Sequence, residues 1–355
     1  MSAAPVDIRD LDRQALTELV VGMGEKPYRA RQVWDWLWKK GARSFAAMSD
    51  LPKAFREELA TKSRLLPLSL VERQQSKDGT VKCAFRTHDG HLIEGVLIPT
   101  SKRLTACISS QIGCSLTCSF CATGKMARVR NLSAGEIVDQ VVSINAIAME
   151  LHGKPLTNIV YMGMGEPLLN YGEVMTSVEH ITAEDGLGMS PRRITISTAG
   201  IAKMIKRVAD EDRRFNLALS LHAATDAKRD RIMPINEQNS LAALKESLKY
   251  YAEKTGRQIT FEYILLRDFN DSEADAQDLV RYASDVFAKV NLIEYNPIEA
   301  GGHQRTSSDK AEAFRQYLEK KGVDAFLRRS RGRDIDAACG QLANKGKAKA
   351  GVSEA

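Results

Sequence analysis

The chain has 355 residues, of which 43% are hydrophobic and 27% are charged, the composition of a soluble globular protein. No run approaches the roughly 18 apolar residues of a membrane helix, and the first residues mix acids with bases, so we expect no signal peptide and a cytoplasmic location. The net charge of +6, much of it within residues 328–355, suggests a polyanionic partner without establishing one. In the cytoplasm, six cysteines favour metal binding or catalysis over structural disulfides.

The N-terminal region has the periodicity of helices. Apolar residues recur with a period near 3.6 over residues 12–21 and again over residues 28–40, where Trp34 and Trp38 share one stripe. Core packing is the default interpretation of such a stripe. We therefore expect a helical accessory domain over residues 1–66, and its basic side chains are candidates for binding RNA.

Residues 67–103 change to a period of two, which is typical of short β-strands. The pairs Asp78–Gly79 and Asp89–Gly90 interrupt these strands and are strong signals for hairpin turns. The region is therefore predicted to be a β meander that connects the helical domain to a cluster of cysteines.

From this point onwards, apolar strand-like runs alternate with helical runs. We count six such strands, and one of the helices starts with a capping box formed by Ser133 and Glu136. This alternation predicts a parallel sheet with helical crossovers, and six units are too few for a closed eight-stranded barrel. We expect an α/β fold with a partial (β/α)6 barrel, or an open doubly wound sheet, over residues 104–300. A C-terminal helix, strand and cysteine segment would follow over 301–342, and a basic, disordered tail over 343–355.

Three cysteines lie within eight residues, at Cys114, Cys118 and Cys121. A closed zinc site needs four ligands, commonly as two separated pairs, and the sequence has no second pair. Cys107 could complete such a zinc site. The alternative is a cluster of four irons held by three thiolates, which leaves one iron open to another ligand. The spacing favours this open [4Fe–4S] cluster, because an open position is typical of a catalytic metal.

Several predicted strands end in glycines or polar residues. GMGEP, which contains Gly165 and Glu166, follows one apolar strand, although in isolation it would be a simple β–α turn. The residues at the ends of other strands are Ser197, Ser220, Leu221, His222 and Asn296. Burying polar groups without partners would cost about 1–3 kcal/mol each. Since ligands of parallel sheets bind at the carboxyl ends of the strands, we expect one shared binding site there.

Two further cysteines are candidates for chemistry. Cys339 is preceded by arginines and followed by Gly340 in a C-terminal segment, and Cys107 lies on the first strand of the β/α region. A single buried cysteine is usually a small hydrophobic residue, and this is our interpretation of Cys83. Two free thiols close to a metal cluster instead suggest a reaction at sulfur.

The Cx₃Cx₂C spacing, with Phe120 before the last cysteine, resembles the radical S-adenosylmethionine (SAM) superfamily, and its place after the first β/α strand strengthens the resemblance. Residues 28–342 further resemble one family of that class, the dual-specificity 23S rRNA and tRNA adenine-C2 methyltransferases. The segments that carry this resemblance are YRARQVWDWLW, HLIEGVLIP, CISSQIGCSLTCSFCATG, YMGMGEPLLN, ISTAGI, LALSLHA, IEYNPI and RRSRGRDIDAACGQL.

The resemblance implies two cofactors, a [4Fe–4S] cluster held by the three clustered cysteines and SAM bound by the strand-end residues above. Two SAM molecules would serve each turnover, one as methyl donor and one as radical source. Cys339 would carry the methyl group as S-methylcysteine, and Cys107 would release the product by forming a transient disulfide with Cys339. Glu94 would accept the proton from carbon 2, although by position alone it could equally be a surface carboxylate.

The resemblance also implies the partners. The substrates would be adenosines in the peptidyl-transferase region of 23S rRNA and on the 3′ side of the tRNA anticodon. Flavodoxin or ferredoxin would supply electrons, and we expect a monomer. The basic RRSRGR segment would contact phosphates. Two alternatives stay open: a C8-specific rRNA adenine methyltransferase with nearly the same core, and a non-enzymatic RNA-binding protein with a structural metal site.

Overall fold

Ten strands form one mixed sheet in the computed structural model, which describes residues 6–299 and 301–344. The strands are β1 (Ser69–Gln75), β2 (Val81–Arg86), β3 (Leu92–Pro99), β4 (Leu104–Ile108), β7 (Asn158–Tyr161), β8 (Ile194–Thr198), β9 (Asn216–Ser220), β10 (Ile259–Leu265), β11 (Ala288–Glu294) and β12 (Ala325–Arg328). They are arranged in this order across the sheet. β1 to β4 pair antiparallel, whereas β4 and β7 to β12 run parallel.

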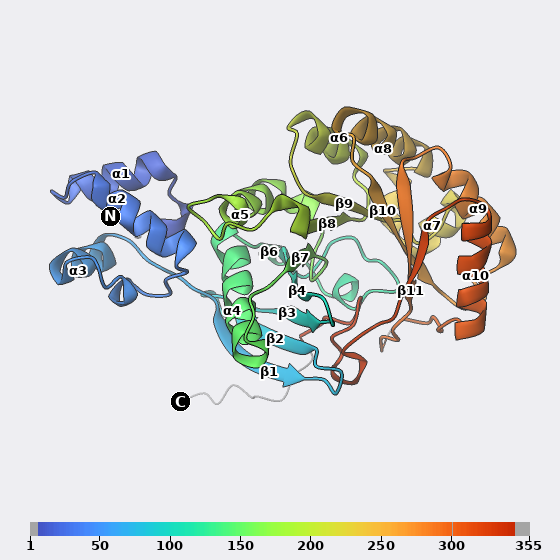
Figure 1. Cartoon of the computed structure of the whole chain (residues 1–355), viewed down its shortest axis with the longest axis horizontal. Helices are drawn as coiled ribbons and strands as arrows, with labels where there is room; N and C mark the ends of the chain where they lie inside the picture. Colours follow the sequence, from blue (N-terminus) through green and yellow to red (C-terminus); the bar gives the residue numbers. More distant parts are fainter. Residues whose placement is uncertain (1–5, 300, 345–355) are drawn as a thin grey trace.

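Three helices, α1 to α3, precede the sheet in the sequence, and the helices from α4 onwards connect the parallel strands of the described residues. The helices are α1 (Arg13–Gly22), α2 (Tyr28–Trp34), α3 (Lys53–Lys62), α4 (Ala134–His152), α5 (Tyr171–Thr182), α6 (Ala202–Asp210), α7 (Asp226–Ile232), α8 (Leu241–Thr255), α9 (Glu273–Ala283) and α10 (Ser308–Lys320). α6, α8, α9 and α10 line the outer rim of the curved sheet (Figure 1). Among the described residues, none of these helices has the length and apolar character needed to cross a membrane.

The expected partial barrel forms, but residues 6–299 and 301–344 contain seven parallel strands instead of six. The additional strand is β12, which pairs in parallel with β11 and corresponds to the strand expected within residues 301–342. The meander also belongs to this sheet, because Val96 of β3 pairs with Cys107 of β4. The sheet therefore begins with three antiparallel strands and continues without a break into the barrel. Residues 345–355 of the expected tail lie outside the described residues.

Local signals in the sequence explain how several elements begin and end. Gly79 and Gly90 adopt φ values of +85° and +87°, as the two predicted hairpin turns require. The predicted capping box forms at the start of α4, where Ser133 and Glu136 bond each other's backbone N–H groups. β10 is buried along its whole length, which is typical of a parallel strand covered on both faces.

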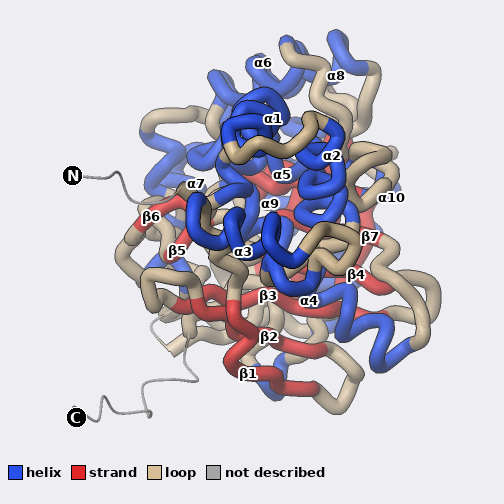
Figure 2. The backbone as a smooth tube through the Cα atoms, turned by 90° about the vertical axis from the view of Figure 1, so that its left-hand side faces the viewer, coloured by secondary structure: helices blue, strands red, loops and turns tan. Residues whose placement is uncertain are grey.

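The N-terminal helices α1 to α3 lie beside α4 and α5 (Figures 1 and 2). The second predicted helix does not stay α-helical to residue 40, because its last part, Asp35–Lys39, is a π-helical turn. Trp38 is buried and stacks on His180 of α5, with ring centroids 3.6 Å apart. Burial lowers the pKa of His180 to about 4, so the neutral ring stacks on the indole at physiological pH.

A buried ion pair joins these helices to the barrel. Arg9 Nη1 lies 2.8 Å from Asp139 Oδ2 on α4, and both side chains are buried. The N–H of Leu68 donates to the same carboxylate oxygen over 2.9 Å. Since one carboxylate contacts both the N-terminal segment and the chain that leads to β1, its loss would leave a buried guanidinium and a buried amide without this partner.

We expect Asp139→Ala to lower the free energy of unfolding by about 3 kcal/mol, because removing one partner of a buried pair leaves the other charge poorly compensated. Urea unfolding followed by circular dichroism measures this change. Asp50→Ala is the control, since the Lys40–Asp50 pair is largely exposed and should contribute less than about 1 kcal/mol. Equal effects of the two variants would contradict the prediction.

Candidate active site

The loop that carries the three clustered cysteines follows β4 and lies across the carboxyl ends of the parallel strands. Its ends pair as the short strands β5 (Gln111–Ile112) and β6 (Arg130–Asn131). Leu116 and Phe120 of the loop bury themselves in an apolar cluster with strand-end residues, and the three cysteines pack against this cluster. The Ser119 N–H also donates to the Ile232 carbonyl over 3.0 Å. Apolar packing therefore fixes the loop over the barrel.

The three thiols interact with one another. Burial raises the pKa of Cys114 to about 11, and it also raises the pKa of Cys118 and Cys121. The charge of a neighbouring thiolate at Cys121 adds to the increase for both Cys114 and Cys118. The thiols are thus neutral at physiological pH without a ligand, and a positively charged cluster would be needed to stabilise three thiolates here.

The donor set fits an iron–sulfur cluster better than a zinc ion. Within the described ranges, no three His, Cys, Asp or Glu side chains converge as the ligands of a single metal ion would. This geometry does not support the alternative in which Cys107 completes a zinc site. Three thiolates that each bind a different iron of a cubane need not converge on one point.

Gly165 and Glu166 lie beside the cysteine loop at the end of β7. A Cβ atom at Gly165 would lie 2.4 Å from Gln111 Cβ, and its φ of +94° favours glycine as well. The Glu166 carboxylate accepts hydrogen bonds from the N–H groups of Leu168 (3.0 Å) and Ala199 (2.7 Å). Burial raises the pKa of Glu166 despite these bonds. The carboxylate thus joins the end of β7 to the end of β8, while the glycine leaves room for the Gln111 side chain.

Ser197 near the end of β8, Ser220 at the end of β9 and His222 just after it also lie at this edge. Ser197 Oγ is 3.2 Å from Ser220 Oγ, and Leu221 is buried next to them. His222 adopts φ +57°, its Nδ1 accepts from the Ile264 N–H over 3.1 Å, and its ring meets Phe120 edge-on at 4.7 Å. Because β8 and β9 are parallel neighbours, their carboxyl ends present these side chains together, as the sequence predicted.

Sequence reasoning missed Arg229, a fully buried arginine on α7. Its guanidinium donates to the carbonyls of Leu221 (3.0 Å), Ala199 and Ser220, and to the side chain of Asn236 (2.7 Å). It therefore supports the backbone that presents the strand-end residues. The amphipathic pattern of a short helix contains no signal for this role, since a charged residue there is expected on the exposed face.

Cys339 belongs to a segment that we call the strap, residues 329–344. The strap lies against the cysteine loop: the Ala122 N–H donates to Gly340 O over 2.7 Å, and Thr123 Oγ1 donates to Leu342 O over 2.7 Å. Asn296, at the end of β11, donates to the Cys339 carbonyl over 3.4 Å. The C-terminal cysteine is thus brought to the same end of the barrel as the three clustered ones.

Cys339 and Cys107 are close enough for their charges to interact, and the charge of Arg328 acts on both thiols. The Cys339 side chain remains in contact with solvent, but surrounding protein atoms raise its pKa by desolvation while the charge of Arg328 lowers it. Burial raises the pKa of Cys107 to about 12, and a thiolate at Cys339 raises it further. Cys83 is buried on β2, in keeping with its interpretation as a small hydrophobic residue.

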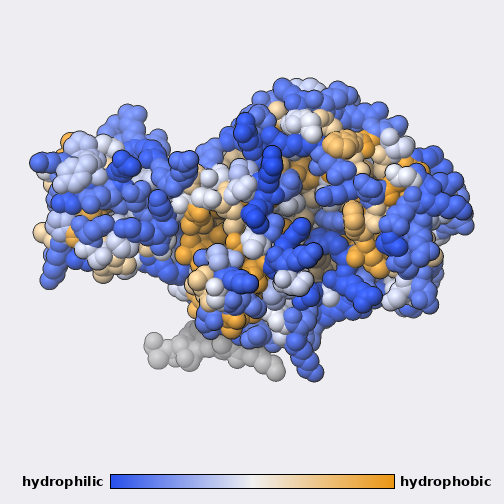
Figure 3. Space-filling view, viewed as in Figure 1, coloured by the Kyte–Doolittle hydropathy of each residue, from blue (hydrophilic) through white to orange (hydrophobic). Residues whose placement is uncertain are grey.

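Glu94 is buried, with 2% of its surface exposed, so the alternative of a surface carboxylate is wrong. One oxygen lies 3.6 Å from Lys82 Nζ. The other accepts from the N–H groups of Ala343 (2.9 Å) and Asn344 (3.2 Å), both in the strap. In the space-filling view of Figure 3, hydrophobic side chains are visible in the middle of the face of the molecule that is drawn, whereas the outer helices are mainly hydrophilic.

Two family models match the chain. Residues 6–65 match the ribosomal RNA large subunit methyltransferase N-terminal domain, and residues 108–280 match the radical SAM superfamily. The chain is 44% identical, with a TM-score of 0.91, to the crystal structure of a radical SAM methyltransferase from Sphaerobacter thermophilus, over 95% of this chain and 99% of that one. The partial barrel with its three-cysteine loop is therefore a radical SAM enzyme fold, as expected.

Full-length relatives narrow the class. The chain is 54% identical to a probable dual-specificity RNA methyltransferase RlmN of Cytophaga hutchinsonii, over 95% of this chain and 93% of that relative. It is 46% identical to a dual-specificity RNA methyltransferase RlmN of Anaeromyxobacter dehalogenans, over 96% and 92%. The chain belongs to the RlmN family of dual-specificity RNA methyltransferases. The family resemblance is confirmed, and the non-enzymatic alternative is wrong.

The burial of His222 predicts a pH-dependent stability. Burial lowers its pKa to about 3 from an ordinary value near 6.5, so between these values only the unfolded chain binds the proton. The neutral His222 ring contributes its whole share of the unfolding free energy above pH 6.5, and this contribution decreases as the pH falls from 6.5 towards 3. In urea titrations, the loss of unfolding free energy between pH 7.5 and pH 5 should be about 2 kcal/mol smaller in His222→Gln than in the wild type. His152→Gln, at an exposed position, should keep the wild-type loss. An equal loss in both variants would rule out this role of His222.

Proposed function

We propose that the protein methylates carbon 2 of adenosine in the peptidyl-transferase region of 23S rRNA and on the 3′ side of the tRNA anticodon. The observation that carries the proposal is the convergence of three groups at one end of the barrel. These groups are the three-cysteine loop, the residues at the ends of β7, β8, β9 and β11, and the strap with Cys339. The names of the relatives support RNA as the substrate.

The residues present fit the two cofactors of the radical SAM superfamily. Cys114, Cys118 and Cys121 would hold a [4Fe–4S] cluster, which when bound supplies the electron that splits SAM into a carbon radical. SAM would contact the residues Gly165, Glu166, Ser197, Ser220, Leu221, His222 and Asn296. Two SAM molecules would be used per turnover, one as methyl donor and one as radical source.

Radical chemistry is needed because carbon 2 of adenine lies between two ring nitrogens and is not nucleophilic. In our proposal the Cys339 sulfur first accepts a methyl group from SAM as a thiolate nucleophile. Arg328 supports this step, because its charge favours the thiolate at Cys339. The methyl carbon on Cys339 loses a hydrogen atom and bonds to carbon 2, so the base is attached to sulfur through that carbon. The Cys107 thiolate then attacks the Cys339 sulfur, which forms a disulfide and breaks the sulfur–carbon bond, and the departing carbon takes up a proton to become the methyl group. Glu94, buried beside the strap, accepts the proton from carbon 2.

We also propose the partners of the reaction. The N-terminal helices and the basic residues 328–333 would hold RNA phosphates, which position a substrate without identifying a base. The target adenosine must leave its stack to reach a buried site. A flavodoxin or ferredoxin would return electrons to the cluster. We expect a monomer that works in the cytoplasm, where rRNA and tRNA are made.

The route through sulfur is tested by anaerobic turnover on RNA with SAM that carries a deuterated methyl group. The wild type should yield labelled 2-methyladenosine, Cys339→Ala should yield none, and Cys107→Ala should accumulate a protein–RNA crosslink. Mass spectrometry of protein and RNA measures all three. Cys83→Ala is the matched control and should behave as the wild type. Methylation by Cys339→Ala would overturn the proposal, and label at carbon 8 would favour the C8-specific alternative.

The cluster assignment is tested without turnover. Cys118→Ala, reconstituted with iron and sulfide, should lose most of its bound iron and acid-labile sulfide, since two thiolates remain for a cluster that needs three from the protein. Chemical analysis of iron and sulfide per chain gives the result. Cys83→Ala should retain the wild-type content. Full iron and sulfide in Cys118→Ala would show that this thiol is not a ligand.

A further inference from the structure

The turn between β1 and β2, residues 76–80, contacts the strap although more than 250 residues separate them in the sequence. Asp78 Oδ2 accepts from the Gly332 N–H over 2.9 Å, and its carbonyl accepts from Arg331 Nη1 over 3.2 Å. In the other direction, the Asp334 carboxylate accepts from Ser76 Oγ (2.6 Å) and from the Lys77 N–H (3.2 Å). Each segment thus supplies one carboxylate to the other's donors.

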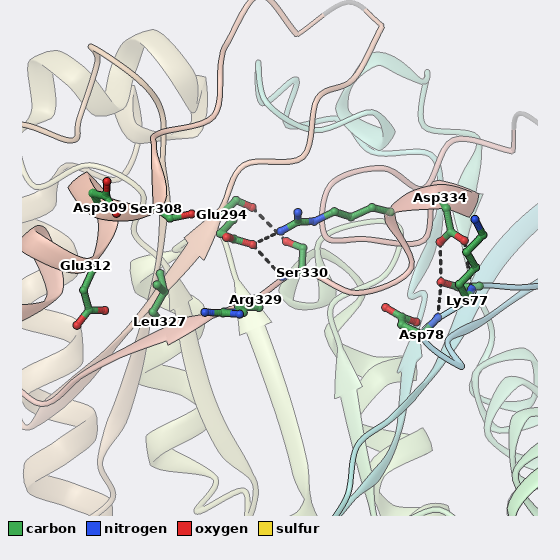
Figure 4. Close-up of a pocket in the computed structure, with 12 residues that line it drawn as sticks. Lys77, Asp78, Glu294, Ser308, Asp309, Glu312, Leu327, Arg329, Ser330 and Asp334 are labelled. Carbon is green, nitrogen blue, oxygen red and sulfur yellow. Dashed lines mark hydrogen bonds and ion pairs between the residues drawn. The ribbon is translucent and has the colours of Figure 1, made fainter.

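These contacts are charge-assisted hydrogen bonds. Although burial opposes ionisation, bonds from Thr80 and from the Gly332 N–H lower the pKa of Asp78 to about 2. The bond from Ser76 lowers the pKa of Asp334. Both carboxylates are therefore ionised at physiological pH, and hydrogen bonds to ionised groups are about twice as strong as neutral ones. Figure 4 shows Asp334 reaching Lys77 next to Asp78, at one side of a cavity of about 710 Å³ that the strap and the start of α10 also line.

The strap changes direction where the turn holds it. Gly332 has φ +66°, and a Cβ atom there would lie 2.8 Å from Ala337 Cβ and 2.9 Å from Thr80 Cγ2. The Ala337 N–H donates to Gly332 O over 2.8 Å, which closes the bend two residues before Cys339. The bend at Gly332, seven residues before Cys339, is thus packed directly against the turn.

We propose that the β1–β2 turn is a positioning element for Cys339, with Asp78 and Asp334 as its positioning residues. The turn holds the strap in the register that places Cys339 against the cysteine loop and opposite Cys107. The catalytic meaning of this inference rests on the proposed function of Cys339. The physical part, that the turn restrains the strap, stands on the hydrogen bonds alone.

The test uses Asp78→Asn in the cluster-loaded enzyme under anaerobic conditions. Asp78 Oδ1 accepts from Thr80 N–H within the turn (2.9 Å), so the asparagine oxygen can keep that bond while its NH₂ group faces the Gly332 N–H. Hydrogen exchange of residues 330–344 by mass spectrometry should accelerate about tenfold or more, because a hydrogen bond to a charged group is lost. The kcat for RNA methylation should fall by a similar factor while KM for RNA stays within about twofold.

Two controls separate positioning from a general loss of structure. Asp285→Asn removes the charge of a half-exposed carboxylate that pairs with Lys245 of α8 rather than with the strap or the cysteine loop, and should leave strap exchange and kcat unchanged. Ser76→Ala and Asp334→Ala should each accelerate exchange. The double variant should exchange about as fast as Asp334→Ala alone, because Asp334→Ala already removes the bond to Ser76 together with the bond to the Lys77 N–H.

Unchanged strap exchange in Asp78→Asn, or a loss of activity that appears only in KM for RNA, would overturn the inference. Failure of the proposed function is distinguishable, because it appears as RNA methylation by Cys339→Ala. In that case the exchange data would still decide whether the turn restrains the strap, and the catalytic meaning would be wrong.

Discussion

Parallel pairing of β4 and β7 to β12 is the constraint on which the rest of the structure depends. Parallel neighbours send all their carboxyl ends to one edge of the sheet, and the helices that return the chain cannot cover that edge. Gly165, Ser197, Ser220 and Asn296 are far apart in the sequence and lie at one edge of the sheet because each is close to the carboxyl end of such a strand. The three-cysteine loop closes over the same edge, since Leu116 and Phe120 find their apolar partners there.

The antiparallel strands add a second constraint. β3 places Glu94 beside β4, and the turn between β1 and β2 reaches the strap after β12. The two ends of the ten-stranded sheet are thus connected through the segment that carries Cys339. Because the strap also bonds the cysteine loop and Asn296, its position depends on the whole barrel rather than on its own short sequence.

Local sequence signals predicted the elements well, and long-range pairing less well. The Asp-Gly turns, the Ser133 capping box and the alternation of strands and helices depend on neighbouring residues, so one sequence suffices to identify them. The meander's continuity with the barrel depends on which strand edges meet, as does the seventh parallel strand, β12, and periodicity does not contain this information.

The candidate site shows the same division. Motif spacing and the family resemblance predicted that the cysteines and strand-end residues belong to one site, and the structure places them at one end of the barrel, whereas Arg229 and Lys82 were missed. Their roles depend on burial against distant backbone and carboxylate groups, and residue type alone predicts exposed side chains at such positions. The burial of Glu94 could not be predicted either, because no residue near it in the sequence indicates that the distant strap covers it.

The bonds between Glu94 and the strap couple this carboxylate to the segment that carries Cys339. Glu94 Oε2 accepts hydrogen bonds from two backbone N–H groups, and those groups lie four and five residues after Cys339. Displacing the strap would remove both bonds and move the Cys339 sulfur at the same time. A single movement of the strap would therefore change the surroundings of both side chains, to which we assign separate steps of the proposed reaction.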